Sequence, residues 1–292
     1  MSRLFAFGLG YSAGTLAARL KNKGWEIAGT ARDQTNIERL GANGYGLARF
    51  AEEPGNREVA KLLHGTTHLL HSIPPGPGDD PVLAHYREEI AALGSLQWIG
   101  YLSTVGVYGD QQGRWVDETT PTAPNSERTE ARVEAEQAWL GFGEETGRPV
   151  QIFRLAGIYG PGRSVFGKLL AGTARRVRKD GQVFSRIHVE DIASVLEASM
   201  ARPRAGAIYN VADDEPAAPG EVVAYAAELL GIPPPPEIAF EDADLSPMAR
   251  SFYEGRRRIG NARIKSELGI RLAFPTYREG LNALLPTLAK EA

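Results

Sequence analysis

The sequence predicts an α/β fold in which a doubly wound parallel sheet is followed by a smaller C-terminal lobe. Short apolar runs alternate with helical patterns over the first half of the chain, which is typical of β–α units in a parallel sheet. The first apolar run, residues 4–7, leads directly into a glycine turn and a helix, and a second run follows at residues 25–30. Together these observations predict a Rossmann-type core.

The glycine turn predicts a phosphate-binding loop. Gly8 permits a tight turn and Gly10 lets the backbone approach a pyrophosphate, while the small Ala13 allows the next helix to pack closely on the strand. Tyr11 and Ser12 belong to the first turn of that helix, whose unpaired N–H groups and positive dipole end favour phosphate. We therefore predict that these residues bind a dinucleotide.

The end of the second run predicts which dinucleotide is preferred. NAD sites place a carboxylate here, which accepts a hydrogen bond from the ribose 2′-hydroxyl. This chain has Thr30-Ala31-Arg32 instead, and an arginine pairs with a 2′-phosphate. Thr30 and Arg32 are therefore predicted cofactor contacts, and the sequence favours NADP(H). NAD stays possible because the neighbouring Asp33 could reach the ribose.

The alternation continues to the middle of the chain. Asp80 is expected to cap a helix that has Pro81 at its first position. A long polar loop is predicted over residues 109–125. Further strands are predicted at residues 46–50, 68–73, 98–103 and 150–154, and further helices at residues 57–63 and 128–145.

The rhythm loosens after residue 154. We interpret residues 1–156 as the dinucleotide-binding core, completed by residues 183–212, in which 183–189 and 207–211 are predicted strands that return to the sheet. Residues 157–182 and 213–292 are interpreted as a smaller substrate-binding lobe, folded over the carboxyl ends of the strands. Open α/β sheets bind their ligands at that edge.

Composition excludes several classes of protein. The net charge of −3 over 292 residues gives no electrostatic case for nucleic acid. The absence of cysteine excludes disulfides and thiolate chemistry, and the histidines have no ligand spacing, so no metal site is predicted. No apolar run approaches the ~20 residues of a membrane span. We expect a cytoplasmic protein that binds a small-molecule substrate.

Five blocks of the sequence form a recognisable series: the N-terminal turn and residues 102–110, 154–162, 186–193 and 209–212. In this order they resemble the extended short-chain dehydrogenase/reductase superfamily, which holds the NAD-dependent sugar-nucleotide epimerases and dehydratases. The chain is most similar to its atypical, NAD(P)-binding branch. The resemblance implies that Ile73 and Pro74 border the adenine and ribose, and that Arg154 and Ala156 contribute to the cofactor site.

The resemblance also implies a catalytic set from which this chain departs. Members use a Ser/Thr at the end of the fifth strand and a Tyr-x-x-x-Lys pair on the next helix; the tyrosine exchanges a proton and the lysine holds the ribose. Thr104 matches the Ser/Thr, and Arg132 can replace the lysine as a ribose donor. Arg128 stands at the tyrosine position and cannot replace a phenol, because a guanidinium stays protonated.

Several other residues have competing interpretations. Tyr108 and Tyr159 are expected on loops near the nicotinamide, so either is a candidate for the missing phenol, and Tyr108 is assigned to the catalytic set; packed loop aromatics are the alternative. For the block around His188, the family implies a structural role in which Asp191 caps a helix. The basic runs at residues 175–179 and 256–265 are interpreted as solvated helix faces, or as a source of one cation for a substrate phosphate or carboxylate.

Two functions fit these observations. The first is an NADP(H)-dependent oxidoreductase, or an epimerase or dehydratase, that acts on a small polar substrate through Thr104, Arg132 and Tyr108. The second is a non-catalytic NADP(H)-binding sensor or regulatory protein, which the missing tyrosine favours. The oligomeric state is open between a monomer and a homodimer, since this superfamily often pairs through the helix that here holds Arg128 and Arg132.

Overall fold

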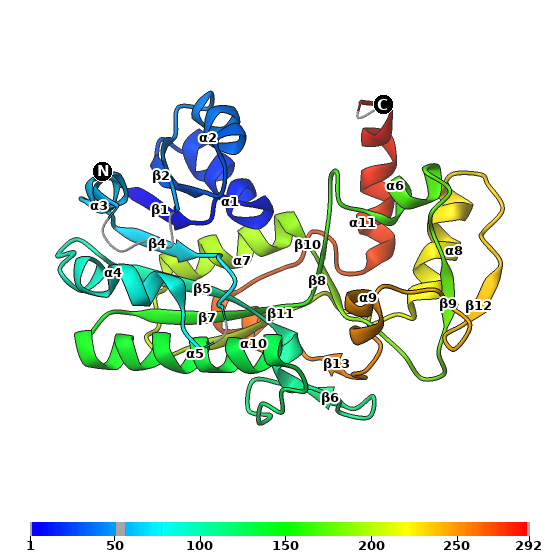
Figure 1. Cartoon of the computed structure of the whole chain (residues 1–292). Helices are drawn as coiled ribbons and strands as arrows, with labels where there is room; N and C mark the ends of the chain where they lie inside the picture. Colours follow the sequence, from blue (N-terminus) through cyan, green and yellow to red (C-terminus); the bar gives the residue numbers. More distant parts are fainter. Residues whose placement is uncertain (1, 51–55, 77, 291–292) are drawn as a thin grey trace. The chain divides into compact units, whose positions relative to one another are not determined.

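The computed structural model describes residues 2–50, 56–76 and 78–290. The chain divides into two compact units, each assembled from three separate stretches. Unit 1 contains Met1–Val107, Ser126–Arg154 and Ile192–Tyr209, and unit 2 contains Tyr108–Asn125, Leu155–Asp191 and Asn210–Ala292. The helices and strands of both units can be followed in Figure 1.

A seven-stranded parallel sheet runs through unit 1 in the order β11-β7-β5-β4-β1-β2-β3 (Figure 1). The strand order reverses between β1 and β4, so the carboxyl end of β1 lies at the switch point where doubly wound sheets bind ligands. The predicted α/β fold is confirmed. The strands are β1 (Arg3–Phe7), β2 (Glu26–Ala31), β3 (Gly46–Arg49), β4 (His68–His71), β5 (Trp98–Thr104), β7 (Val150–Leu155) and β11 (Ile208–Val211).

Helices cover both faces of this sheet, and side chains alternate between them. Phe5 and Phe7 pack against α3, α4 and α5 in one hydrophobic cluster. On the other face α1 and α7 lie together, because Arg19 donates to Ser194 at 3.0 Å and Lys23 pairs with Glu197 at 2.9 Å. The helices are α1 (Tyr11–Asn22), α2 (Gln34–Gly41), α3 (Arg57–Leu63), α4 (Pro81–Ala91), α5 (Glu127–Thr146) and α7 (Val189–Ala201).

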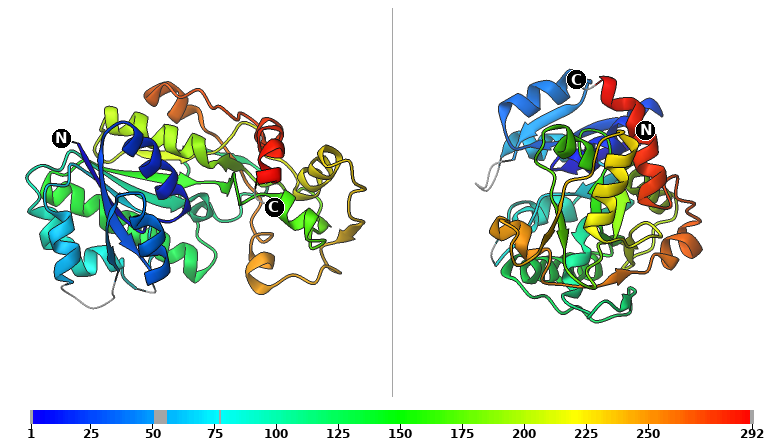
Figure 2. Two further views of the ribbon diagram at one scale, coloured as in Figure 1. Left: turned by 90° about the horizontal axis from the view of Figure 1, so that it is seen from above. Right: turned by 90° about the vertical axis from the view of Figure 1, so that its right-hand side faces the viewer.

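Unit 2 has its own core, in which α6, α8 and α11 pack together. α8 and α11, yellow and red in the figures, lie side by side (Figures 1 and 2). Its strands form three separate parallel pairs. The elements are β6 (Trp115–Val116), β8 (Gly157–Tyr159), α6 (Val165–Leu170), β9 (Arg176–Arg178), β10 (Arg186–His188), α8 (Pro219–Leu229), β12 (Glu237–Ala239), α9 (Pro247–Ser251), β13 (Arg258–Ile259), α10 (Ala262–Leu268), α11 (Tyr277–Leu284) and a final 3₁₀ segment (Leu285–Lys290).

Most predicted elements of the first half are confirmed. Asp80 caps α4 as expected, since its carboxylate accepts the N–H groups of Val82 and Leu83 at 3.1 Å. One prediction for a later segment is wrong. The predicted strand at 183–189 does not return to the central sheet, because β10 pairs with β8 instead. The loop predicted at 109–125 is confirmed apart from the two-residue β6, which pairs with β13, far along the chain.

Candidate functional site

The glycine turn after β1 is held by the neighbouring strand. Gly8 has φ +83°, a left-handed conformation that favours glycine. Its N–H donates to the Thr30 hydroxyl at 2.9 Å, and the Leu9 N–H donates to the Thr30 carbonyl at 2.8 Å. A Cβ on Gly8 would lie 3.0 Å from Cγ1 of Ile73. The structure therefore brings Gly8, Thr30 and Ile73 together, with the buried Thr30 supporting the turn from below.

The start of α1 offers backbone donors without a capping side chain. Gly10 is the N-cap residue, and the first turn of the helix holds no acidic residue. A Cβ on Gly10 would meet no protein atom within 4 Å, so the backbone is open to a ligand here. Ser12 and Ala13 are buried and Tyr11 is half-buried. These residues fit the pyrophosphate of a dinucleotide, since the N–H groups and dipole of the helix favour an anion.

The residues after β2 separate a cation from a carboxylate. Arg32 is exposed, whereas Asp33 is the N-cap of α2 and accepts the Asn36 N–H at 2.9 Å. The Asn36 amide also donates to both carboxylate oxygens of Asp33, at 3.1 and 2.9 Å. These hydrogen bonds lower the pKa of Asp33. The carboxylate that left NAD as an alternative is therefore engaged within its own helix.

Thr104 and Arg132 lie on neighbouring elements. Thr104 ends β5, and its hydroxyl accepts the Gly106 N–H at 3.1 Å. Arg132, on α5, donates from one Nη1 to the Leu102 carbonyl at 2.8 Å and to the Tyr101 hydroxyl at 3.1 Å. These contacts hold the Arg132 guanidinium against Leu102, which lies two residues before Thr104 on β5. The threonine thus makes the local backbone contact that was the alternative to catalysis, while its own O–H proton stays available to donate.

A buried charged network lies next to this pair and was not predicted. Glu136 on α5 accepts from the Ser103 hydroxyl at 2.6 Å and from Nη2 of Arg154 at 2.7 Å. Glu136 is 3% exposed and Arg154 is 4% exposed. The predicted contact of Arg154 with the cofactor is therefore corrected to a buried ion pair. Glu136 lies four residues after Arg132, on the same helical face, and this spacing was the signal that could have revealed it.

The two tyrosines proposed as phenol donors are packed inside unit 2. Tyr108 is completely buried, and its hydroxyl donates to Oδ1 of Asn210 at 2.8 Å. Tyr159 is 8% exposed and packs against α11, and burial, together with the nearby Asp213, raises its pKa. The hydroxyl of Tyr108 is thus bonded within unit 2. This geometry favours the packed aromatic for Tyr108, and its catalytic assignment stays a prediction.

The remaining predicted cofactor contacts lie on loops or in packed backbone. Pro74 is exposed at the start of the loop that follows β4. Ala156 is buried in unit 2, and its N–H donates to the Val211 carbonyl at 3.0 Å.

Asp191 lies in the first turn of α7, and its carboxylate accepts the N–H groups of Ala273 and Phe274 at 2.7 and 3.0 Å. Asp191 thereby fastens a distant loop of unit 2.

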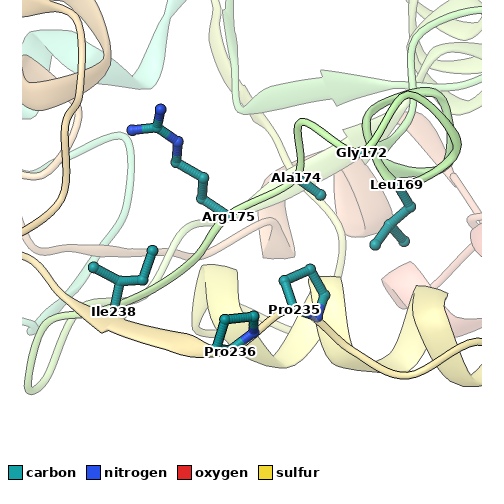
Figure 3. Close-up of a pocket in the computed structure, with 7 residues that line it drawn as sticks. All are labelled: Leu169, Gly172, Ala174, Arg175, Pro235, Pro236 and Ile238. Atoms are coloured by element: carbon teal, nitrogen blue, oxygen red, sulfur yellow. The ribbon is translucent and has the colours of Figure 1, made fainter.

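The basic runs of unit 2 are engaged with neighbouring acids and carbonyls. The first run lies on β9, so its interpretation as a helix face is wrong. Arg176 and Arg178 pair with Glu237 at 3.3 and 2.9 Å, and in the second run Lys265 pairs with Asp214 at 2.5 Å. A pocket of about 260 Å³ lies next to the first run (Figure 3). It is lined by Leu169, Gly172, Ala174, Arg175, Pro235, Pro236 and Ile238.

This pocket holds little chemistry. In Figure 3 the Arg175 side chain extends away from Leu169 and the two prolines, and its guanidinium pairs with Asp244 at 3.4 Å. The other lining residues are apolar or glycine.

Across the part of the chain that the structure describes, no group of three histidine or acidic residues is arranged to hold a metal ion. Within the same residues, no helix has the length and apolar character needed to cross a membrane.

Comparison with known proteins agrees with this geometry. The family model "NAD dependent epimerase/dehydratase family" matches residues 89–212. Protein YeeZ of Escherichia coli K12 is 31% identical over 289 residues, which cover 94% of this chain and 97% of that protein. A conserved protein of unknown function from Silicibacter pomeroyi is 51% identical in a solved structure, with a TM-score of 0.89 and 99% of each chain covered.

A more distant solved structure shares the fold. The dTDP-glucose 4,6-dehydratase of Bacillus anthracis, solved in complex with NAD, has a TM-score of 0.76 at 19% identity, covering 99% of this chain and 97% of its own. The resemblance found in the sequence is confirmed by these matches. The glycine turn, the parallel sheet and the matched segments together show that this chain belongs to the NAD dependent epimerase/dehydratase family.

Proposed function

We propose that the chain is an NADP(H)-dependent enzyme with oxidoreductase or epimerase/dehydratase chemistry on a small polar substrate. The end of β2 carries the choice of cofactor. Arg32 is exposed there, and Asp33 has both oxygens bonded to Asn36. A carboxylate free to accept from a ribose 2′-hydroxyl would favour NAD. An exposed guanidinium beside an engaged carboxylate favours NADP(H).

Each end of the cofactor has candidate partners in unit 1. Gly8, Gly10 and the first turn of α1 would hold the pyrophosphate, and Arg32 the 2′-phosphate. The nicotinamide supplies hydride transfer when the cofactor is bound. Thr104 would donate its hydroxyl proton in a hydrogen bond to a substrate oxygen, because its oxygen already accepts from Gly106. Arg132, fixed by the Leu102 carbonyl, would donate to a ribose hydroxyl.

Sugar nucleotides are the substrates to test first. The dehydratase from Bacillus anthracis is named for a dTDP-sugar, and such a substrate is small and polar and carries hydroxyl groups that hydride transfer can oxidise. With Tyr108 and Tyr159 buried, the proton that accompanies hydride transfer would come from water or from the substrate itself. Catalysis through such a donor is slower than through a positioned phenol.

The experiment is a titration of the purified protein with NADPH and with NADH, followed by cofactor fluorescence and by calorimetry. Arg32→Ala should weaken NADPH by roughly tenfold or more and leave NADH nearly unchanged, since a charge-assisted contact to phosphate contributes ~1.5–3 kcal/mol. Arg57→Ala is the matched control, because Arg57 is an exposed arginine elsewhere in unit 1. Equal losses for both cofactors would remove Arg32 from recognition of the 2′-phosphate.

The alternative is a non-catalytic NADP(H)-binding sensor or regulatory protein, which the burial of both candidate tyrosines favours. The two functions differ in turnover. A panel of sugar nucleotides and small carbonyl compounds, incubated with the protein and either NADP⁺ or NADPH, should change the absorbance of reduced cofactor or yield an altered sugar if the chain is an enzyme. Tight binding of NADPH with no product from any member of the panel would favour the sensor.

A further inference from the structure

A second arginine lies next to Arg32 at the same edge of the sheet. Arg49 is the last residue of β3, and in the parallel register of β2 and β3 it is the partner of Ala31, the residue before Arg32. Neighbouring strands are about 4.8 Å apart. Arg32 and Arg49 therefore lie at the carboxyl ends of two adjacent strands, β2 and β3, at the same edge of the sheet as the glycine turn after β1.

The backbone around Arg49 is fixed on both sides. The Phe50 N–H donates to the Ala31 carbonyl at 3.1 Å, which continues the strand pairing past Arg49. Nδ2 of Asn56 donates to the Arg49 carbonyl at 3.0 Å, and Asn56 is also the N-cap of α3. Arg49 is thus exposed on an anchored main chain. An anchored backbone lowers the entropy that a side chain loses when it binds a ligand.

The charges of both arginines reach the same carboxylate. The pKa of Asp33 is lowered first by the hydrogen bonds from Asn36, and then also by the charges of Arg32 and Arg49. Both guanidinium groups therefore lie near enough to the start of α2 to act on Asp33. Within the described residues, no carboxylate lies within ion-pair distance of either guanidinium.

We propose that Arg32 and Arg49 form a two-arginine clamp for the 2′-phosphate of NADP(H), an inference that rests on the function proposed above. A phosphate monoester carries between one and two negative charges at pH 7, so a single arginine leaves part of its charge unpaired. Two planar guanidinium groups on adjacent strands can bond different phosphate oxygens. Asp33 stays out of the clamp because its oxygens are bonded to Asn36.

The test compares 2′,5′-ADP with 5′-AMP as ligands, alongside NADPH and NADH, by calorimetry on the full chain. The two members of each pair differ only at the 2′ position, so they measure recognition of the 2′-phosphate without any turnover. Arg49→Ala should weaken 2′,5′-ADP and NADPH by roughly tenfold and change 5′-AMP and NADH less than about twofold. Arg49→Lys should recover part of the loss, because it keeps the charge but not the fork. Arg57→Ala is the control.

The outcomes distinguish the two-arginine clamp from the proposed binding of NADP(H) through Arg32 alone. If Arg32→Ala removes the preference for NADPH and Arg49→Ala behaves like Arg57→Ala, then the clamp is wrong and NADP(H) binding through Arg32 stands. If the wild-type chain binds 5′-AMP as tightly as 2′,5′-ADP, both proposals fall. If each single variant weakens 2′,5′-ADP and the loss in the double variant is smaller than the two single losses combined, the clamp is supported, because two groups that hold one phosphate are coupled.

Discussion

A buried carboxylate in each unit shows the difference between a paired and an unpaired acid. In unit 1 the buried Glu136 is paired with Arg154, and Asp80 is bonded to His71 at 2.7 Å. In unit 2 neither carboxylate oxygen of the buried Asp213 has a hydrogen-bond partner among the side chains that the structure describes, and the charge of Arg186 nearby favours its ionised form. Buried groups stay charged when they are paired, and an isolated one becomes neutral instead.

This difference predicts where each unit is sensitive. Burial raises the pKa of Asp213 to about 8 against the opposing charge of Arg186, and burial lowers the pKa of His188 to about 4, so both groups favour their neutral forms near pH 7. Unit 1 depends instead on keeping its charged partners together, next to Thr104 and Arg132. We therefore expect unit 1 to respond most to the loss of a partner, and unit 2 to respond most to pH.

The largest effect is expected from Glu136→Ala in unit 1. This change leaves the Arg154 guanidinium buried without its carboxylate, and breaking a buried pair by removing one partner destabilises by about 3–5 kcal/mol. Urea unfolding measures the loss, and Glu134→Ala, an exposed change on the same helix, is the control. A loss no larger than that of the control would show that the paired network of unit 1 is not what holds β5, α5 and β7 together.

The next effect concerns the pH dependence of unit 2. The folded-state pKa of Asp213 is raised from 3.8 to about 8, so its contribution to stability is fully present below pH about 4 and is lost as the pH rises through 8. Between pH 6 and pH 9 the wild-type chain should lose about 2–3 kcal/mol for this reason, and Asp213→Asn should lose much less. Urea unfolding at both pH values measures this.

Asp242→Asn, a change of an exposed aspartate in the same unit, is the control for that experiment. It should show the same pH dependence as the wild-type chain. If Asp213→Asn also kept the full loss at high pH, then Asp213 would be charged in the folded state and would have a partner. The contrast between paired and unpaired buried groups would then fail.

The smallest effect is expected from Tyr108→Phe, which tests a contact of unit 2 that is satisfied. The change removes one buried hydrogen bond to Asn210 and should destabilise by about 1 kcal/mol. Thermal unfolding gives this value, and titration with NADPH should show unchanged affinity. Weakened cofactor binding at unchanged stability would return Tyr108 to the functional site, and it would show that sequence reasoning had placed this residue correctly.

Local signals predicted most of unit 1 from the sequence. The glycine turn, the strand that ends just before Arg32 and the cap at Asp80 each depend on residues a few positions apart. A local sequence pattern is therefore enough to predict them. The positions of Thr104 and Arg132 followed from the family resemblance, since the blocks keep their order. The NADP(H) preference stays a prediction.

What the sequence did not reveal depends on distant partners. The hydroxyl of Tyr108 donates to Asn210, which lies over a hundred residues away in the chain. Arg154 is buried in an ion pair with Glu136, which lies on another element. The pairing of β10 with β8 and of β6 with β13 depends likewise on segments that no local pattern links. Polar groups in such places look functional in a sequence, because burial by a distant segment leaves no mark on their neighbours.

The alternation of the chain between the two units has a consequence for how this protein can be cut or shortened. Each unit is a composite of three stretches that interleave along the sequence. No single break in the backbone yields either unit whole. A truncation that extends past Val107 from the N-terminus, or past Asn210 from the C-terminus, removes pieces of both units. Neither half can therefore be inherited, transplanted or expressed alone as one continuous fragment, and any rearrangement that keeps one unit must carry the other with it.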